Sequence, residues 1–168
     1  MRIPRWAALA IWPVALLFFH FSLPLILSLF SGHYGWTGGS PGLWNAVGLA
    51  LVAPGLILIL WALKLHFTSA SEGWKLELAP GYLLARGPYR YTRNPMYVGA
   101  FLIWLGWTIF YGSAAVLVAF LVLSAIILFV LVPLEERALE RRFGEEYRRY
   151  KGEVPRWIPL TRKVTRRL

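Results

Sequence analysis

The sequence contains no cysteine among its 168 residues, and this lack excludes several kinds of chemistry. A disulfide scaffold, a thiol nucleophile and a cysteine-ligated zinc site all require the missing side chain. Its three histidines, His20, His33 and His66, are far apart in the chain, so we expect no metal site. Charged residues are also scarce, at 15% against roughly 25% in soluble globular domains.

Apolar residues are correspondingly abundant. They make up 58% of the chain, and the mean hydropathy is +0.55. A soluble domain of this size could not bury so much apolar surface, and a disordered chain would not contain it. No charged residue occurs over residues 6–63 or over residues 94–134, runs of 58 and 41 residues. Because a helix needs about 20 apolar residues to cross a bilayer, each run has room for two crossings.

The sequence therefore predicts an all-α polytopic membrane protein with about four transmembrane helices in a single domain. Residues 31–42, rich in glycine and serine, divide the first apolar run, and Gly112-Ser113 divides the second. The expected spans are 6–30, 43–63, 96–111 and 114–132, with a cytoplasmic loop at 64–95 and a cytoplasmic amphipathic helix and tail at 134–168.

The basic residues predict the orientation. Two precede the first span, five lie between the second and third, and eleven follow the fourth. The positive-inside rule then places both termini in the cytoplasm. A cleaved signal peptide is the alternative for residues 1–30, but its apolar core is too long and no clear small-residue cleavage site follows. We expect the basic tail to contact anionic lipid headgroups rather than nucleic acid.

Four charged residues lie where the chain meets the membrane. Glu135 and Glu136 directly follow an apolar span, and Arg90 and Arg93 directly precede another. Charges at that depth are costly unless they are paired or bind a ligand. A zwitterionic amino-acid group would suit both signs, because arginine binds carboxylates and glutamate binds ammonium groups. The alternative is that these residues pair with one another.

An amphipathic helix is predicted after the fourth span. Leu139, Phe143, Tyr147 and Tyr150 fall at i, i+4, i+8 and i+11 and form one apolar stripe. Four arginines occupy the other face, a pattern typical of a helix at a membrane surface. Gly144 weakens this helix by about 1 kcal/mol relative to alanine.

Two sequence blocks resemble those of one superfamily. Residues 87–99, GPYRYTRNPMYVG, resemble the G-x-Y-x-x-x-R-H-P-x-Y-x-G motif of the isoprenylcysteine carboxyl methyltransferase and phospholipid methyltransferase superfamily. Residues 135–155 resemble its E-E-x-x-L-x-x-x-F-G-x-x-Y-x-x-Y-x-x-x-V-P tail. The blocks occur in the family's order, and the resemblance covers residues 76–159, about half the chain. It is specific for the superfamily and not for a substrate.

The resemblance implies an integral-membrane methyltransferase with its cofactor, S-adenosyl-L-methionine, in a cytoplasm-facing pocket. Its acceptor would be lipidic or a small hydrophobic molecule with a carboxylate, amine or thiol. Carried over by position, the cofactor-binding residues are Gly81, Tyr82, Leu83, Leu84, Tyr89, Asn94, Pro95, Met96, Tyr97, Glu135 and Glu136, and the catalytic residues are Arg93, Asn94 and Glu135. Glu135 is the first choice for the cofactor's amino group and Glu136 the second, while Asn94 and a nearby arginine would hold its carboxylate end.

Two positions depart from the family pattern. Asn94 replaces the usual histidine, and asparagine can form hydrogen bonds but cannot titrate. Leu131 stands four residues before Glu135, where the isoprenylcysteine enzymes have an arginine linked to the substrate carboxylate. That position gives no support for a prenylcysteine acceptor.

An acceptor that must lose a proton needs a base, and the chain offers few. They are Glu135, Glu136 and Tyr97, with His66 as an outside candidate that is more simply an interfacial histidine. Two other functions remain open at this point. One is an NADPH-dependent enzyme like the sterol reductases, and the other is a non-catalytic membrane subunit or small transporter.

Overall fold

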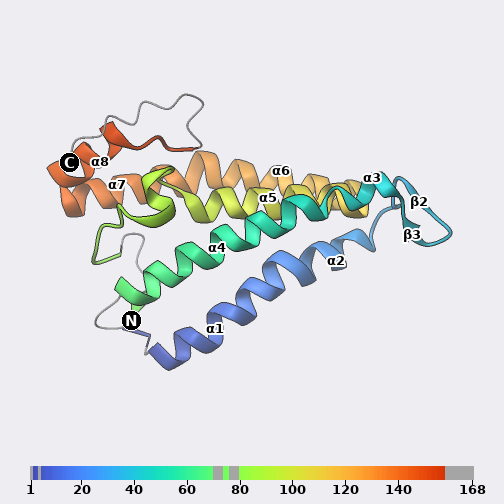
Figure 1. Ribbon diagram of the computed structural model, residues 1–168, viewed down its shortest axis with the longest axis horizontal. Helices are drawn as coiled ribbons and strands as arrows, with labels where there is room; N and C mark the ends of the chain where they lie inside the picture. Colours follow the sequence, from blue (N-terminus) through green and yellow to red (C-terminus); the bar gives the residue numbers. More distant parts are fainter. Residues whose placement is uncertain (1, 4, 70–73, 76–79, 158–168) are drawn as a thin grey trace.

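The structure, a computed structural model, is a bundle of apolar helices (Figure 1) and describes residues 2–3, 5–69, 74–75 and 80–157. The first half contains α1 (Arg5–Leu17), the π-helical turn η1 (Phe18–Ser22), α2 (Leu23–Ser28), α3 (Leu43–Ala46) and α4 (Leu49–Ser69). The second half contains the 3₁₀ turn η2 (Gly87–Arg90), α5 (Pro95–Tyr111), α6 (Ala114–Ile126), the π-helical turn η3 (Ile127–Leu131), α7 (Val132–Phe143) and α8 (Glu145–Glu153). Two short antiparallel pairs complete it, β1 (Arg2–Ile3) with β4 (Trp74–Lys75) and β2 (Trp36–Thr37) with β3 (Ser40–Pro41).

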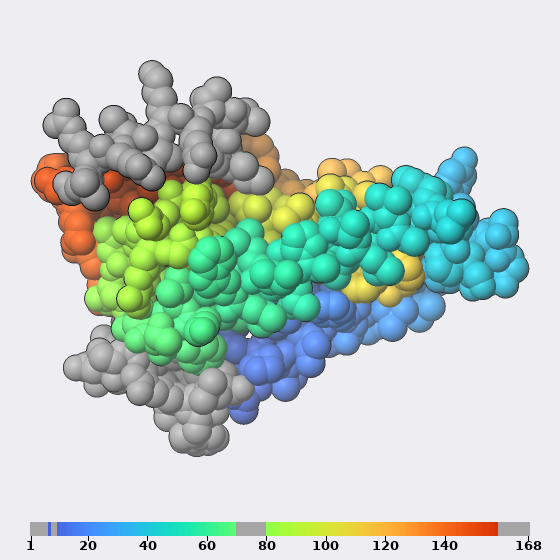
Figure 2. All heavy atoms as spheres, in the orientation of Figure 1, coloured from blue at the N-terminus to red at the C-terminus, as the bar shows by residue number. Residues whose placement is uncertain are grey.

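The predicted all-α membrane class is confirmed. Three helical runs are long and apolar enough to cross a bilayer, Ala10–Ser28, Leu43–Ser69 and Ala114–Phe143, and α5 is a shorter apolar helix. α5 lies in the middle of the bundle, where it packs most extensively against α4 and also contacts α6 and α2. In the space-filling view (Figure 2), α4 forms much of the front surface and the first helical run lies beneath it.

Two helix boundaries differ from the expected ones. α4 continues six residues past Leu63, the end of the expected span, to Ser69. After the fourth span the sequence predicts one amphipathic helix, and the structure has two. Gly144 adopts a φ of 54° and a ψ of −121°, so the chain turns there and α8 starts in a new direction. Only glycine reaches such a conformation without strain.

A seam of glycines joins α4 to α5. A Cβ added at Gly99 would lie 2.7 Å from the carbonyl oxygen of Gly55, and one added at Gly106 would lie 2.6 Å from that of Gly48. The two backbones therefore touch at two levels, a close approach that small residues allow in membrane helices. The seam fixes the register of the two helices and hence the height at which α4 ends.

The first helical run is attached to α5 through a backbone carbonyl. Pro24 has no N–H to offer the carbonyl of His20, four residues earlier. The indole Nε1 of Trp107 donates to that oxygen instead, at 2.6 Å. A carbonyl without its usual donor four residues later is thus bonded by a neighbouring helix.

The loop between the first two helical runs closes one end of the bundle. Asn45 is fully buried, and its Nδ2 donates to the carbonyls of Tyr34 and Ile109, each at 3.0 Å. Ser31 and Ser113 are joined through their hydroxyls at 2.6 Å. The segment 80–94, the end of α4 and α8 lie at the other end, so the two apolar hairpins present their charged segments on one side (Figure 1).

Enlarging a glycine of the seam should destabilise the bundle. We expect Gly99→Ala to lower the free energy of unfolding by about 1–3 kcal/mol, because the new methyl group would overlap the backbone of α4. The measurement is thermal unfolding in detergent, followed by circular dichroism. Gly32→Ala is the control, since nothing lies within 4 Å of a Cβ at that position. Equal unfolding temperatures for the two variants would contradict the seam.

Candidate functional site

A pocket lies at the end of the bundle where α4 finishes and α5 begins. It holds about 470 Å³ of empty space, part of it open to solvent. Four segments that are distant in the sequence meet around it: the end of α4, residues 80–94, α7 and α8. The lining residues are His66, Pro80, Tyr82, Leu83, Leu84, Tyr89, Arg93, Asn94, Glu135, Glu136, Leu139, Tyr147 and Tyr150.

The segment before α5 is shaped by glycine and proline. Gly87 has a φ of 59°, and a Cβ there would lie 2.6 Å from Leu65, so glycine allows the chain to pass close to α4. The turn η2 then directs Tyr89 into the pocket, where the hydroxyl of Tyr150 donates to the Tyr89 carbonyl at 2.7 Å. Burial, followed by the charge of Glu135, raises the pKa of the Tyr89 hydroxyl. Tyr89 therefore stays protonated at neutral pH.

The residues before α5 also bind the segment that follows α8. The backbone N–H of Arg93 donates to the carbonyl of Pro155 at 3.0 Å. The carbonyl of Arg156 accepts from Thr92 Oγ1 at 2.9 Å and from Asn94 Nδ2 at 3.0 Å. The Asn94 side chain, predicted to bind cofactor, lines the pocket but donates its amide hydrogen to the protein itself.

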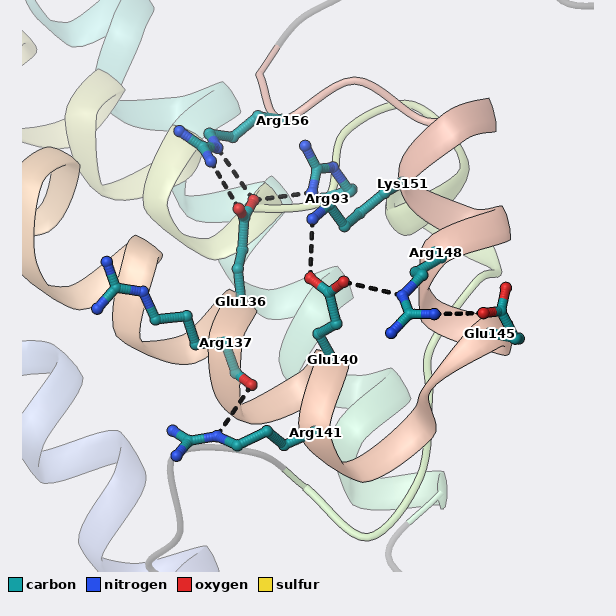
Figure 3. Close-up of polar contacts among 9 residues, drawn as sticks. All are labelled: Arg93, Glu136, Arg137, Glu140, Arg141, Glu145, Arg148, Lys151 and Arg156. Atoms are coloured by element: carbon teal, nitrogen blue, oxygen red, sulfur yellow. Dashed lines mark hydrogen bonds and ion pairs between the residues drawn. The ribbon is translucent and has the colours of Figure 1, made fainter.

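Glu136 is neutralised by two arginines (Figure 3). Its Oε1 accepts from Arg93 Nη1 at 2.8 Å and from Arg156 Nε at 3.0 Å, while its Oε2 accepts from Arg156 Nη2 at 2.6 Å. The hydrogen bonds to Glu136 raise the pKa of Arg156. The Arg93 side chain is only 10% exposed, and its buried Nε has no acceptor in the described part of the chain. The alternative that these charges pair with one another is thus realised for Glu136 and Arg93.

Glu135, one residue earlier, has a different environment. Tyr97 Oη donates to its Oε2 at 3.1 Å. Among the described residues no lysine or arginine pairs with it. Because Glu135 faces the pocket without a counter-ion from these residues, its carboxylate is available to a cationic group of a ligand.

The structure brings most of the predicted site residues together. Those that line the pocket are Tyr82, Leu83, Leu84, Tyr89, Arg93, Asn94, Glu135 and Glu136. Tyr97 reaches the site through Glu135. Three others lie away from the pocket wall. Gly81 is exposed near Arg142, Pro95 is buried at the start of α5, and Met96 packs against the apolar core of Ile59, Leu63 and Ile103.

Sequence reasoning did not place several residues of the wall at the cofactor site. His66 was only an outside candidate for a base, and it reaches the wall because α4 runs past Leu63 to Ser69. Tyr147 and Tyr150 belong to the apolar stripe, which was expected to face a membrane surface. The turn at Gly144 brings the stripe inward instead, where these two tyrosines and Val154 form a buried cluster with Leu83 and Leu139.

A family model and two relatives with named activities point to methyltransferases. A model of the phospholipid methyltransferase family matches residues 43–146. An uncharacterised protein of Haemophilus influenzae is 38% identical over 63 residues, which are all of that protein and 38% of this chain. The methanethiol S-methyltransferase 1 of Bradyrhizobium diazoefficiens is 38% identical over 80 residues, and the methanethiol S-methyltransferase of Crocosphaera subtropica is 39% identical over 78 residues.

Each of the two methanethiol enzymes is matched over 45% of this chain, but over only 26% and 28% of its own length. No solved structure matches the chain.

Removing the Glu136 charge should loosen the end of the bundle. In Glu136→Gln, Arg93 would stay buried without its counter-charge, at a cost of about 3–5 kcal/mol in the free energy of unfolding. We expect a lower unfolding temperature and faster proteolysis at residues 154–157, which this cluster holds. Glu145→Gln is the control, because Glu145 is 85% exposed and its ion pair within the described residues is with an exposed Arg148. If both variants unfold like the parent protein, the cluster does not stabilise this end.

Proposed function

The chain belongs to the phospholipid methyltransferase family, and from this we propose that it transfers a methyl group from S-adenosyl-L-methionine to a lipidic or small hydrophobic acceptor. The observation that carries the proposal is the pairing pattern of the two adjacent glutamates. Glu136 is neutralised by arginines, and Glu135 is left facing the pocket without a counter-ion among the described residues. A pocket built to receive an ammonium group needs such a carboxylate.

The pocket residues fit the donor's amino-acid end. Glu135 would bind its ammonium group, with Tyr97 holding the carboxylate in place through the 3.1 Å hydrogen bond. The unused Nε of Arg93 would bind its carboxylate group. Leu83, Leu84 and Tyr147 supply apolar and aromatic wall for the rest of the molecule. These contacts shift the proposed roles toward Glu135 and Arg93, because Asn94 Nδ2 donates to the Arg156 carbonyl and Met96 packs against the core.

Bound in this way, S-adenosyl-L-methionine supplies a methyl group already activated by a sulfonium. The protein then has to align the acceptor and exclude water, and these two effects can lower the activation free energy by several kcal/mol. Two features serve these tasks here. The tyrosines of η2 and α8 form part of the pocket wall, and the segment after α8 is bonded to the residues before α5. The names of the methanethiol enzymes support a small thiol as one class of acceptor.

The pocket end is proposed to be cytoplasmic, with both termini on that side, since the basic residues gather in the segments at that end.

Binding of the donor gives the direct test. Calorimetry with S-adenosylhomocysteine should show binding to the purified protein, and NADPH should show none. In Glu135→Gln we expect a Kd about 10–100-fold higher, since a hydrogen bond to a charged group contributes about 1.5–3 kcal/mol. Glu140→Gln is the matched control, because Glu140 lies on the same helix but pairs with Lys151 and Arg148 at the surface. No binding by folded parent protein would rule out the proposed donor.

The orientation can be tested with introduced cysteines, because the chain has none of its own. Ser40→Cys lies in the β2–β3 hairpin and Arg141→Cys lies on α7, both at exposed positions. A membrane-impermeant maleimide added to intact cells should label the first and leave the second unlabelled until the membrane is opened. The reverse labelling would place the pocket on the outer side.

A further inference from the structure

One histidine in the pocket is held by two tyrosines. His66 lies near the end of α4, and its Nε2 is 2.7 Å from the hydroxyl of Tyr89. Its Nδ1 is 3.0 Å from the hydroxyl of Tyr82, and this hydroxyl donates to the His66 carbonyl at 3.2 Å. All three side chains line the pocket that contains Glu135. Neither the family resemblance nor the comparisons assign His66 a role.

These contacts define where the protons lie. Tyr82 has one hydroxyl hydrogen, and the His66 carbonyl can only accept it. Nδ1 must then be the nitrogen that donates to the Tyr82 oxygen. In a neutral imidazole the other nitrogen, Nε2, is unprotonated and accepts the hydroxyl hydrogen of Tyr89. This is the one arrangement of a neutral ring that makes all three contacts hydrogen bonds.

The same geometry also suits a protonated ring. With a second proton on Nε2, the imidazolium would donate to Tyr82 and to Tyr89 over the same two distances. His66 can therefore gain a proton from Tyr89 without any change in the positions of the three side chains. Two hydroxyl partners accommodate both charge states of the ring, because a hydroxyl oxygen can both donate and accept a hydrogen bond.

We infer that Tyr89 and His66 form a proton relay that deprotonates the methyl acceptor, so that the acceptor is a thiol or an amine and not a carboxylate. The inference rests on the proposed function and assigns the substrate class of the same site. Tyr89 is the proposed catalytic residue, because it lines the pocket and its hydroxyl contacts His66. His66 acts through Tyr89, and Tyr82 positions His66.

With a thiol acceptor, methyl transfer and proton transfer take place together. A bond forms between the acceptor sulfur and the methyl carbon, and the bond from that carbon to the sulfonium breaks, its electron pair remaining on the departing neutral thioether. The acceptor's proton passes to the Tyr89 oxygen while the hydroxyl hydrogen of Tyr89 passes to His66 Nε2. The positive charge that begins on the sulfonium thus ends on the imidazolium, which releases its proton to water through the open pocket.

The groups around Tyr89 favour a relay over a permanent phenolate. Tyr82, Tyr97 from α5, Glu135 from α7 and Tyr150 from α8 all face it. Burial and the Glu135 charge raise the pKa of Tyr89, so the residue does not hold a negative charge on its own. It can pass a proton only if a partner takes one at the same time, and His66 is that partner.

The first test needs no turnover. Protein with ¹⁵N-labelled histidine should show one ring, lost in His66→Gln, with a proton on Nδ1 and a hydrogen-bonded, unprotonated Nε2 at neutral pH. In Tyr89→Phe the Nε2 resonance should move to the position of a nitrogen without a hydrogen-bond donor. A proton on Nε2 in the neutral ring, or no change in Tyr89→Phe, overturns the relay.

The second test measures methyl transfer to a panel of short and long alkyl thiols, amines and carboxylates as a function of pH. The relay predicts transfer to a thiol or an amine. For a thiol we expect His66→Gln and Tyr89→Phe to lose about 100-fold in rate at pH 7. They should recover most of it as pH rises through the thiol's own pKa, because the acceptor then arrives as thiolate. Tyr91→Phe, in the same segment but 58% exposed and outside the pocket, is the control and should match the parent.

Calorimetry distinguishes failure of the proton relay from failure of the proposed methyltransferase function. If the parent binds S-adenosylhomocysteine and the relay variants bind it equally, their loss of rate lies in proton transfer. A loss that is the same at every pH, no loss at all, or transfer only to carboxylates overturns the relay and leaves the proposed function standing. Failure of the parent to bind the ligand removes the proposed function itself.

Discussion

The carboxylate of Glu136 holds together the end of the bundle where the pocket lies. It binds an arginine from the residues before α5 and another from the segment after α8, and it stands on α7. These elements are distant in the sequence, and a single buried charge gives them a common partner. Because Glu136 takes both arginines, its neighbour Glu135 faces the pocket with only the Tyr97 hydroxyl as a partner among the described residues. The same arrangement of charges thus pairs Glu136 with arginines and leaves the Glu135 carboxylate available to a ligand.

Most of the fold followed from the distribution of charge. Two charge-free runs and the basic segments around them were enough to predict a polytopic α-helical protein, and the structure confirms that class. The residues at which helices end were harder to predict from the sequence. Lys64 looked like the edge of a span, yet α4 continues because a charged residue at a helix end can reach the interface with its long side chain. Gly144 looked like a weak point in one helix, and its positive φ instead makes a turn.

In the candidate site, too, the sequence predicted some features and not others. Residues that lie in motifs, such as Tyr89 and Glu135, could be placed near one another from sequence because the blocks resemble a known superfamily. What each side chain binds could not be read in this way. Asn94 donates its amide to the C-terminal segment, and Met96 turns to the core, because contacts between distant segments decide both. His66 belongs to no motif, and only the register set by the glycine seam brings it to the pocket.

The proline in the first helical run has a consequence for how the protein is assembled. With Pro24 in place, the His20 carbonyl has no donor four residues later in its own helix, and the indole of Trp107 donates to it. The first hairpin segment emerges from the ribosome long before that indole is made. Until then the carbonyl lacks the indole donor within an apolar span, where a polar group without a partner is costly. The first helical run therefore gains this hydrogen bond only after α5, which carries Trp107, has been synthesised.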